Sequence, residues 1–141
     1  MGANDLILVP NAKEYWDYIR VLRNDPMVRI GFVQRKDITV QQQIKYMEKY
    51  GNHYYIGIVN QELVGYIGEI DGDIRVVVAP EFQRKGYGSK MVSLFMELKP
   101  DSRPKILKYN LISQMMFEKL GFIRTAEDET FYYYGVRKNI A

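Results

Sequence analysis

The chain has 141 residues, of which 47% are hydrophobic and 26% charged, with a formal net charge of +3. This length and mixture predict one globular domain over residues 1–141. The basic residues are spread along the chain, which disfavours a nucleic-acid-binding surface, and no apolar run approaches the roughly 20 residues that cross a bilayer.

The chain contains no cysteine and a single histidine, His53. Disulfides, thiolate metal sites and a cysteine nucleophile are therefore excluded, as are metal sites built from several histidines. The N-terminus shows no basic stretch followed by an apolar one, so we expect no signal peptide. We expect a cytoplasmic protein with no membrane partner, no nucleic-acid partner and no metal.

Two helices are predicted in the first third of the chain. Residues 11–14, Asn-Ala-Lys-Glu, have the spacing of a capping box, and the helix that they open should end before Asp25-Pro26. Residues 39–42, Thr-Val-Gln-Gln, form a second capping box, opening a helix that Gly51 ends. The stretch between the helices lacks periodicity and is a candidate substrate loop.

Strands follow from His53 onward. β-branched and aromatic residues predict strands over Tyr54–Val59, Leu63–Ile70 and Ile74–Val78. Asn60-Gln61 and Asp71-Gly72 separate them, and Asp-Gly between strands is a strong hairpin signal, so these strands should form an antiparallel meander. The third strand is apolar on both faces and is expected to be central and covered on both sides.

The remainder of the chain alternates between helices and strands. A helix from Tyr87 to Leu98 is followed by a short strand near Ile106-Leu107, a helix Leu111–Leu120 stopped by Gly121, and closing strands Phe122–Thr125 and Thr130–Val136. The expected fold class is α/β, with a central mixed sheet of six to seven strands and helices on both faces.

A candidate anion site lies where the third strand runs through a loop into a helix. Helix N-termini carry unpaired N–H groups and a partial positive charge, so they hold phosphates well. Gly86 and Gly88 let the backbone approach a ligand, and Arg84, Lys85 and Lys90 add positive charge. An ordinary strand-to-helix turn with solvated basic residues is the alternative, and the dinucleotide and Walker A spacings are missing.

The same segment resembles a known family. Gln83-Arg84-Lys85-Gly86-Tyr87-Gly88 is similar to the Gln/Arg-x-x-Gly-x-Gly/Ala signature of GNAT acetyltransferases, and a Val-x-Pro precedes it. In that family the loop binds the coenzyme A pyrophosphate, and the preceding strand pairs with pantetheine. The resemblance implies acetyl-coenzyme A as co-substrate, contacted by Val76, Val77, Val78, Gln83, Arg84, Lys85, Gly86, Tyr87, Gly88, Ser89 and Lys90.

Residues 110–122 resemble a later motif of the family, Asn-x-x-Ser-x-x-x-Phe/Tyr-x-Lys-x-Gly-Phe. The resemblance implies further cofactor contacts from Asn110, Ser113, Phe117 and Lys119. The first three share one stripe of a helix, so the stripe could face the cofactor while Ile112, Met116 and Leu120 pack inward. Considered alone, Asn110 is simply a helix N-cap and Gly121 a C-cap.

Acetyl transfer to an amine needs a neutral amine, and a primary alkyl amine has a pKa of about 10.4. A general base, or a water chain leading to one, would take the proton. The family often places a carboxylate near the entry to the central strand, where Glu69 and Asp73 are the candidates. Burial in an apolar strand predicts a raised pKa for Glu69. Asp71 fits a turn residue, and His53 fits a structural role. Divergence of two strands would present backbone donors to the developing oxyanion.

Phe117 stands where many relatives carry the tyrosine that protonates the departing thiolate. Tyr87, Tyr109, Tyr132 or water could replace it, or the thiolate could leave unprotonated, since a thiol pKa is about 8.5. Relatives that acetylate alanine-type ribosomal N-termini also carry a glutamate where Lys105 stands, which disfavours that subfamily.

Residues 23–29 resemble a segment shared by amino-sugar and protein N-terminal acetyltransferases, although a simple turn explains them too. The function expected is direct acetyl transfer to a small primary amine such as an amino sugar. The alternatives are a protein N-terminal acetyltransferase and a non-catalytic acyl-coenzyme A sensor. The twelve tyrosines could serve the core, an acceptor pocket or a homodimer interface.

Overall fold

The computed structural model of the chain describes residues 2–29 and 36–136. Its elements, in chain order, are the 3-10 turn Ala3–Asp5, β1 (Ile7–Pro10), α1 (Lys13–Asn24), α2 (Pro26–Arg29), α3 (Val40–Tyr50), the 3-10 turn Gly51–His53, β2 (Tyr54–Val59), β3 (Glu62–Ile70), β4 (Asp73–Val78), the 3-10 turn Pro80–Phe82, α4 (Tyr87–Leu98), β5 (Lys105–Leu107), α5 (Leu111–Lys119), β6 (Phe122–Glu127) and β7 (Phe131–Val136). The predicted α/β class is confirmed.

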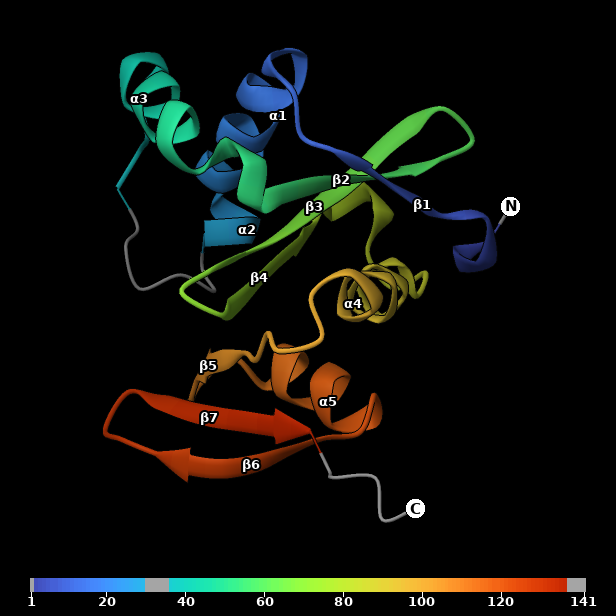
Figure 1. Cartoon of the computed structure of the whole chain (residues 1–141), viewed down its shortest axis with the longest axis vertical. Helices are drawn as coiled ribbons and strands as arrows, with labels where there is room; N and C mark the ends of the chain where they lie inside the picture. The colour runs from blue at the N-terminus through green and yellow to red at the C-terminus, as the bar shows by residue number, and fades with distance from the viewer. Residues whose placement is uncertain (1, 30–35, 137–141) are drawn as a thin grey trace.

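The strands form two antiparallel sheets, of order β1-β2-β3-β4 and β5-β7-β6 (Figure 1). They meet through one isolated parallel bridge, between Asp73 at the start of β4 and Arg103 just before β5. The expected mixed sheet is therefore divided, because only the first rung of the parallel pairing between β4 and β5 is formed.

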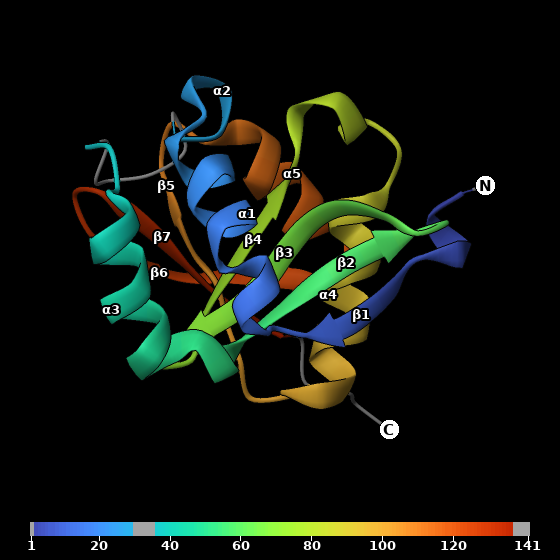
Figure 2. The same cartoon turned by 90° about the horizontal axis from the view of Figure 1, so that it is seen from above.

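Helices cover both faces of the first sheet, as expected. Figures 1 and 2 show α1, α2 and α3 on one face and α4 on the other, with α5 beside the second sheet. One core cluster, which includes Ile19 and Tyr66, lies between α1, α3 and the first sheet. The other, centred on Met91 and Phe95 of α4, joins the first sheet to the second. Each face of the first sheet thus has its own core.

Several predicted boundaries hold, and one cap does not. The Thr39–Gln42 capping box is formed in both directions, at 3.1 and 2.9 Å. The first capping box is absent: α1 begins at Lys13 without a side-chain cap. The Asn11 amide instead donates to the carbonyl oxygen of Gly51 at 3.1 Å, which ties the end of β1 to the end of α3. This tertiary hydrogen bond competes for the side chain that local spacing assigned to the cap.

The meander follows the turn chemistry of its sequence. Asn60 and Gln61 both have positive φ, as do Asp71 and Gly72, which is the conformation of a type I′ hairpin turn. β1, which the sequence analysis did not predict, pairs antiparallel with β2. It is only four residues long and ends in proline, so its local signal is weak.

Gly65 sets the close approach of β3 to β4. A Cβ at this position would lie 2.1 Å from the carbonyl oxygen of Val77, a backbone atom that cannot move without displacing β4. We expect Gly65→Ala to lower the free energy of unfolding by about 3 kcal/mol, at the upper end of the usual cost of overpacking.

Urea denaturation measures this effect, and Gly72→Ala is the control. Gly72 has a φ of 83° but open space around its Cβ, so its replacement should cost only about 1 kcal/mol of backbone strain. Equal losses for the two variants would contradict the steric explanation.

Candidate active site

The outer edge of β4 carries backbone groups that are not paired with another strand. The Ala79 N–H donates to Val64 of β3 at 2.8 Å, so the odd-numbered residues of β4 hydrogen-bond inward to β3. The backbone N–H and C=O groups of the even-numbered residues point away from β3, in the plane of the sheet. The bond from the Ile74 N–H to the carbonyl oxygen of Arg103, at 3.1 Å, shows this direction. The backbone groups of Val76 and Val78 therefore face the gap between β4 and β5.

Asp73 occupies the point where β4 and β5 part. The Arg103 N–H donates to the Gly72 carbonyl oxygen at 2.7 Å, so the next rung of a parallel ladder would join the Lys105 N–H to Ile74. The Lys105 N–H donates instead to Oδ1 of Asp73, at 3.0 Å. β5 then pairs with β7, and the two sheets separate. We call the resulting gap the β4–β5 opening.

This geometry corrects the expectation that β4 is central and covered on both sides. The strand lies between the two sheets, but it is the last strand of its own sheet. Val77 is buried, whereas Val76 and Val78 are only half-buried. Among the described residues, no backbone group pairs with the outward N–H of Val76 or Val78. An extended ligand with amide groups could complete this edge as an added strand.

The opening leads to the exposed N-terminus of α4. Gly86 is the N-cap, with a φ of 80°, and no side chain in the described part of the chain caps this helix. The first intrahelical bond runs from Lys90 to Gly86, so the N–H groups of Tyr87, Gly88 and Ser89 remain available. The Gln83 amide donates to the Val78 carbonyl oxygen at 3.2 Å, which fixes the loop against the end of β4.

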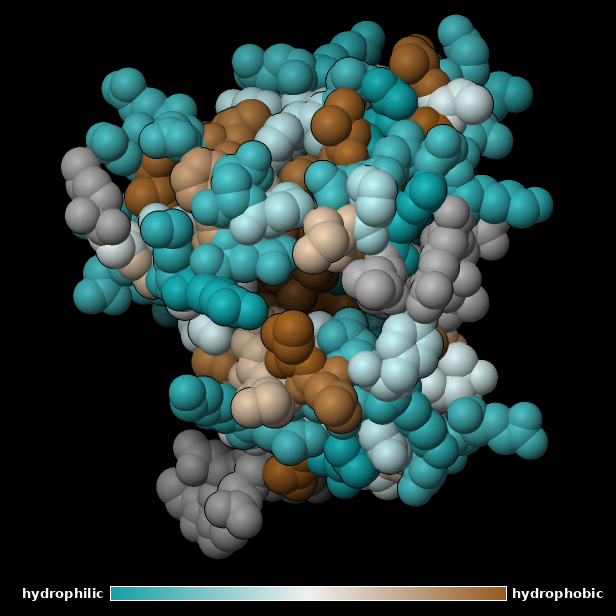
Figure 3. Space-filling view, turned by 180° about the vertical axis from the view of Figure 1, so that it is seen from behind, coloured by the Kyte–Doolittle hydropathy of each residue, from teal (hydrophilic) through white to brown (hydrophobic). Residues whose placement is uncertain are grey.

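Positive charge surrounds this helix end. Arg84 and Lys85 are exposed and Lys90 is half-buried, whereas Tyr87 is buried in the core. A Cβ on Gly88 would lie 3.0 Å from Sδ of Met116, so this glycine brings α4 close to α5. Seen from behind, the surface is hollowed between the two halves of the molecule, and the hollow has a hydrophobic floor (Figure 3).

The α5 motif is placed differently from the prediction. The Asn110 side chain accepts a hydrogen bond from the Ser113 N–H at 3.2 Å, so it is an N-cap. Phe117 is 2% exposed and packs edge to face on Phe122 at 5.2 Å, which leaves it little surface for a ligand. The expected inward packing of Ile112 is wrong, because its side chain is 82% exposed. The stripe predicted to face a cofactor therefore turns, at Phe117, into the core.

Lys119, predicted from the same motif, is exposed in the last turn of α5. The tyrosines considered as acids also lie in different surroundings. Tyr87 is buried beside Phe82, Tyr109 is exposed just before α5, and Tyr132 on β7 is stacked by the Arg124 guanidinium at 3.5 Å. Of these, Tyr109 is the most accessible.

Glu69 belongs to a small polar cluster at the end of β3. Its carboxylate accepts from the Gly72 N–H at 2.8 Å and lies 3.1 Å from Nδ1 of His53. Burial acts to raise the pKa of Glu69, but these two partners outweigh it, and the pKa lies below its usual value. The predicted increase is wrong because the sequence shows the apolar strand but not the hydrogen bonds.

Asp73 has the opposite balance. Burial raises the pKa of its carboxyl group, and the hydrogen bond from Lys105 and the charge of Arg75 only partly oppose this. Nε of Arg75 lies 3.7 Å from Oδ2 of Asp73. Asp73 therefore combines a structural bond at the closed end of the β4–β5 opening with an elevated pKa.

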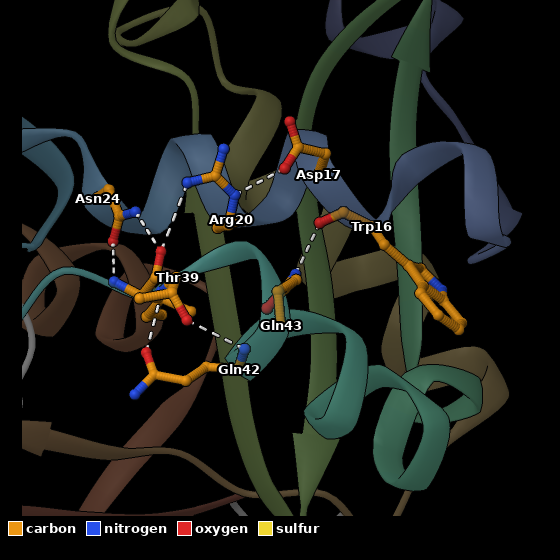
Figure 4. Close-up of polar contacts among 8 residues, drawn as sticks. Trp16, Asp17, Arg20, Asn24, Thr39, Gln42 and Gln43 are labelled. Carbon is orange, nitrogen blue, oxygen red and sulfur yellow. Dashed lines mark hydrogen bonds and ion pairs between the residues drawn. The ribbon is translucent and has the colours of Figure 1, made fainter.

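The structure describes only part of the candidate substrate loop. α2 occupies Pro26–Arg29, and residues 30–35 lie outside the described residues. Asn24 exchanges two hydrogen bonds with the backbone of Ile38, at 2.7 and 2.9 Å, and Gln43 donates to the Trp16 carbonyl oxygen at 2.6 Å (Figure 4). These bonds join α1 to the start of α3, so Asn24 of the predicted segment has a structural role.

Sequence analysis missed a group of polar side chains on the α1–α3 face of the first sheet. Tyr54, Tyr66 and Arg75 lie on neighbouring strands and point to the same side as Val77. The alternation of β4, with Arg75 two residues before Val77, was the available signal. No cluster suited to a metal ion, and no helix able to span a membrane, occurs in residues 2–29 and 36–136.

Comparison with known proteins identifies the family. A family profile described as an acetyltransferase (GNAT) domain matches residues 50–124, just over half of the chain. The chain belongs to this family, and the resemblance drawn from its motifs is confirmed. A search of curated protein sequences finds no significant match.

Solved structures agree on the fold. A domain from Methanocaldococcus jannaschii has a TM-score of 0.79 at 18% identity, covering 92% of this chain and 97% of that one. Spermidine N-acetyltransferase from Vibrio cholerae, in complex with CoA and spermine, has a TM-score of 0.77 at 14% identity, covering 93% and 94%. The aminoglycoside acetyltransferase AAC(6')-Ib, in complex with ribostamycin and coenzyme A, has a TM-score of 0.78 at 20% identity, covering 95% of this chain and 94% of that one.

The Glu69 cluster predicts a pH dependence of stability. Because the pKa of Glu69 is lower in the folded than in the unfolded chain, its contribution is present above about pH 5 and lost as pH falls through the folded pKa. Glu69→Gln should cost about 1–2 kcal/mol at pH 7 and little at pH 3, after allowing for the exposed side of His53. Urea denaturation at both pH values tests this; a cost independent of pH would contradict it.

Proposed function

We propose that the protein is an acetyl-coenzyme A-dependent N-acetyltransferase that acts on a small primary amine. The observation that carries the proposal is the continuous path from the outward edge of β4 to the exposed N-terminus of α4. The proposal is supported by membership in the GNAT family and by the fold shared with proteins solved in complex with coenzyme A.

The residues along this path fit coenzyme A. The outward backbone groups of Val76 and Val78 suit the two amides of a pantetheine chain lying in the β4–β5 opening. The N–H groups at the start of α4 suit a pyrophosphate, with Arg84 and Lys85 supplying further positive charge. In this arrangement the pyrophosphate lies at the mouth of the opening and the thioester lies near Val76, toward the closed end.

In the reaction, the amine nitrogen attacks the thioester carbon, a C–N bond forms, the C–S bond breaks, and the thiolate leaves. The protein must hold the amine uncharged and remove its proton. Asp73 and Glu69 are the proposed bases, and the raised pKa of Asp73 makes it a stronger base than an exposed aspartate. The chain contains no cysteine for an acyl-enzyme, so we propose direct transfer.

The acceptor is the least constrained part of the proposal. An amino sugar remains the proposed acceptor, and a protein N-terminus is the alternative. A non-catalytic acyl-coenzyme A sensor is the second candidate function, favoured by Phe117, since a buried phenylalanine cannot protonate a thiolate. A homodimer and a cytoplasmic location stay predictions.

One assay separates the enzyme from the sensor. The protein is incubated with acetyl-coenzyme A and a panel of amines while thiol release is followed. Saturable release that requires a particular amine supports the transferase. Tight binding of acetyl-coenzyme A without release on any amine supports the sensor and overturns the transferase.

Gly86→Glu tests the coenzyme A site. The variant places a negative charge at the helix N-terminus and a side chain where φ is 80°. We expect the dissociation constant for coenzyme A, measured by calorimetry, to rise at least about tenfold from charge repulsion and the lost approach of the ligand.

Gly121→Glu is the matched control, because Gly121 also has positive φ and open space around it, but lies just after the C-terminal end of a different helix, α5. It adds the same charge and a similar strain, and its affinity for coenzyme A should match the unmodified protein. If Gly86→Glu bound coenzyme A unchanged, the site assignment would be wrong.

Two substitutions of Asp73 separate its proposed roles as base and as the residue that parts β4 from β5. Asn retains an oxygen that can accept from Lys105 but cannot act as a base, whereas Ala removes both functions. If Asp73 is the base, Asp73→Asn should lower kcat about 100-fold or more with the KM for acetyl-coenzyme A unchanged.

If its role is only to hold the opening, Asp73→Asn should retain activity, and Asp73→Ala should raise the KM for acetyl-coenzyme A. Steady-state kinetics of both variants distinguishes these results. Unchanged kinetics in both would exclude either role.

A further inference from the structure

The amine must reach β4 from the α1–α3 face of the first sheet. On the opposite face, Val76 and Val78 pack against the core cluster that contains Met91 and Phe95 of α4, so that side is filled. On the α1–α3 face, β4 presents Asp73, Arg75 and Val77. On this face Val77 is buried but Arg75 is exposed, so a thioester lying near Val76 is approached beside Arg75.

Arg75 stands in a gap in the sheet surface. Its register partner on β3 is Gly68, whose own partner on β2 is Tyr54. A Cβ on Gly68 would lie 2.5 Å from the Tyr54 ring, so the ring lies across this glycine toward β4. The Tyr54 hydroxyl is 2.6 Å from that of Tyr46, on α3. The Arg75 side chain is 41% exposed, and its charge interacts with both of these hydroxyls.

A second guanidinium and two further phenols surround the same space. Burial raises the pKa of Tyr66, while the charges of Arg23 and Arg75 act to lower it, which places both guanidinium groups near this hydroxyl. Tyr18, on α1, also acts to raise the pKa of Tyr66, which places its hydroxyl in the same region. The Tyr18 hydroxyl is buried and has no hydrogen-bond partner among the described residues. The face therefore combines positive charge with an unused hydrogen-bonding group.

Two carboxylates lie near these groups: Asp73 beside Arg75, and Glu81, whose charge acts on the Tyr18 hydroxyl. Asp73 lies 3.7 Å from Arg75, but one of its oxygens also accepts from the Lys105 N–H. Arg75 has a fork of five N–H donors, more than its contacts with Asp73 and the Tyr54 hydroxyl use. Such a fork suits a carboxylate or a phosphate, whereas it would repel the ammonium groups of a polyamine.

We propose that the acceptor amine is part of a molecule that also carries a carboxylate or phosphate group, and that Arg75 binds this acidic group on the α1–α3 face of β4. The inference rests on the proposed acetyltransferase function. Tyrosine hydroxyls would add hydrogen bonds to the same group, and Arg23 would add to the positive potential. The acidic group and the amine would thus be held on either side of the thioester end of the β4–β5 opening.

The test compares acceptors that differ only in the acidic group. One pair is glucosamine 6-phosphate and glucosamine; the other is 5-aminovalerate and pentylamine; spermidine is the cationic probe. We expect kcat/KM to be about 10- to 100-fold higher for an acidic member than for its neutral partner, the range of a hydrogen-bonded charge pair, and lowest for spermidine. The pair that shows the preference identifies phosphate or carboxylate as the group bound.

Variants of Arg75 assign the preference to its side chain. Arg75→Gln should remove most of the preference while leaving the KM for acetyl-coenzyme A unchanged, and Arg75→Lys should retain part of it. Arg124→Gln, which removes one positive charge from the second sheet, should retain all of it. Circular dichroism confirms that each variant is folded.

The outcomes separate the two proposals. Acetyl transfer at equal rates within both pairs overturns this inference and leaves the acetyltransferase in place. A preference that survives in Arg75→Gln overturns the role of Arg75. Binding of acetyl-coenzyme A with no transfer to any amine overturns the proposed function itself.

Discussion

The hydrogen bond from the Lys105 N–H to the Asp73 carboxylate occurs where two strands of a parallel pair would otherwise continue. Each rung of such a ladder is favourable, so an open edge in the middle of a protein needs a competing partner. Asp73 provides it at 3.0 Å, and β5 turns away to pair with β7. The outward groups of Val76 and Val78, the hollow between the sheets and access to β4 all depend on this separation.

The two faces of the first sheet then have different tasks. On the α4 side, Gly57 and Gly65 make room for Met91, whose side chain lies within 3.1 Å of where their Cβ atoms would be, and the core is closely filled. On the α1–α3 side, Gly68 makes room for the Tyr54 ring, and Arg75 keeps its contact with solvent. Small residues on neighbouring strands thus close one side against ligands and leave polar groups on the other.

Local signals predicted most of the elements. The Thr39–Gln42 capping box and the turns at residues 60–61 and 71–72 depend on neighbours within four residues, and all three form. Asn11 had an equally good local signal, but a tertiary bond to Gly51 took its side chain. Phe117 and Ile112 show the same limit: spacing places residues on one stripe of a helix but does not say which stripe meets the core.

The sequence by itself determined the α/β class, the GNAT family and the loop at residues 83–88 with its helix, because glycines, charges and capping residues act locally. Only the tertiary structure decided that β4 has a free outer edge, that Glu69 has a lowered pKa and that Arg75 lies among buried tyrosines. These properties come from residues distant in the sequence, such as Lys105 beside Asp73 and His53 beside Glu69, whose approach depends on how the two sheets pack.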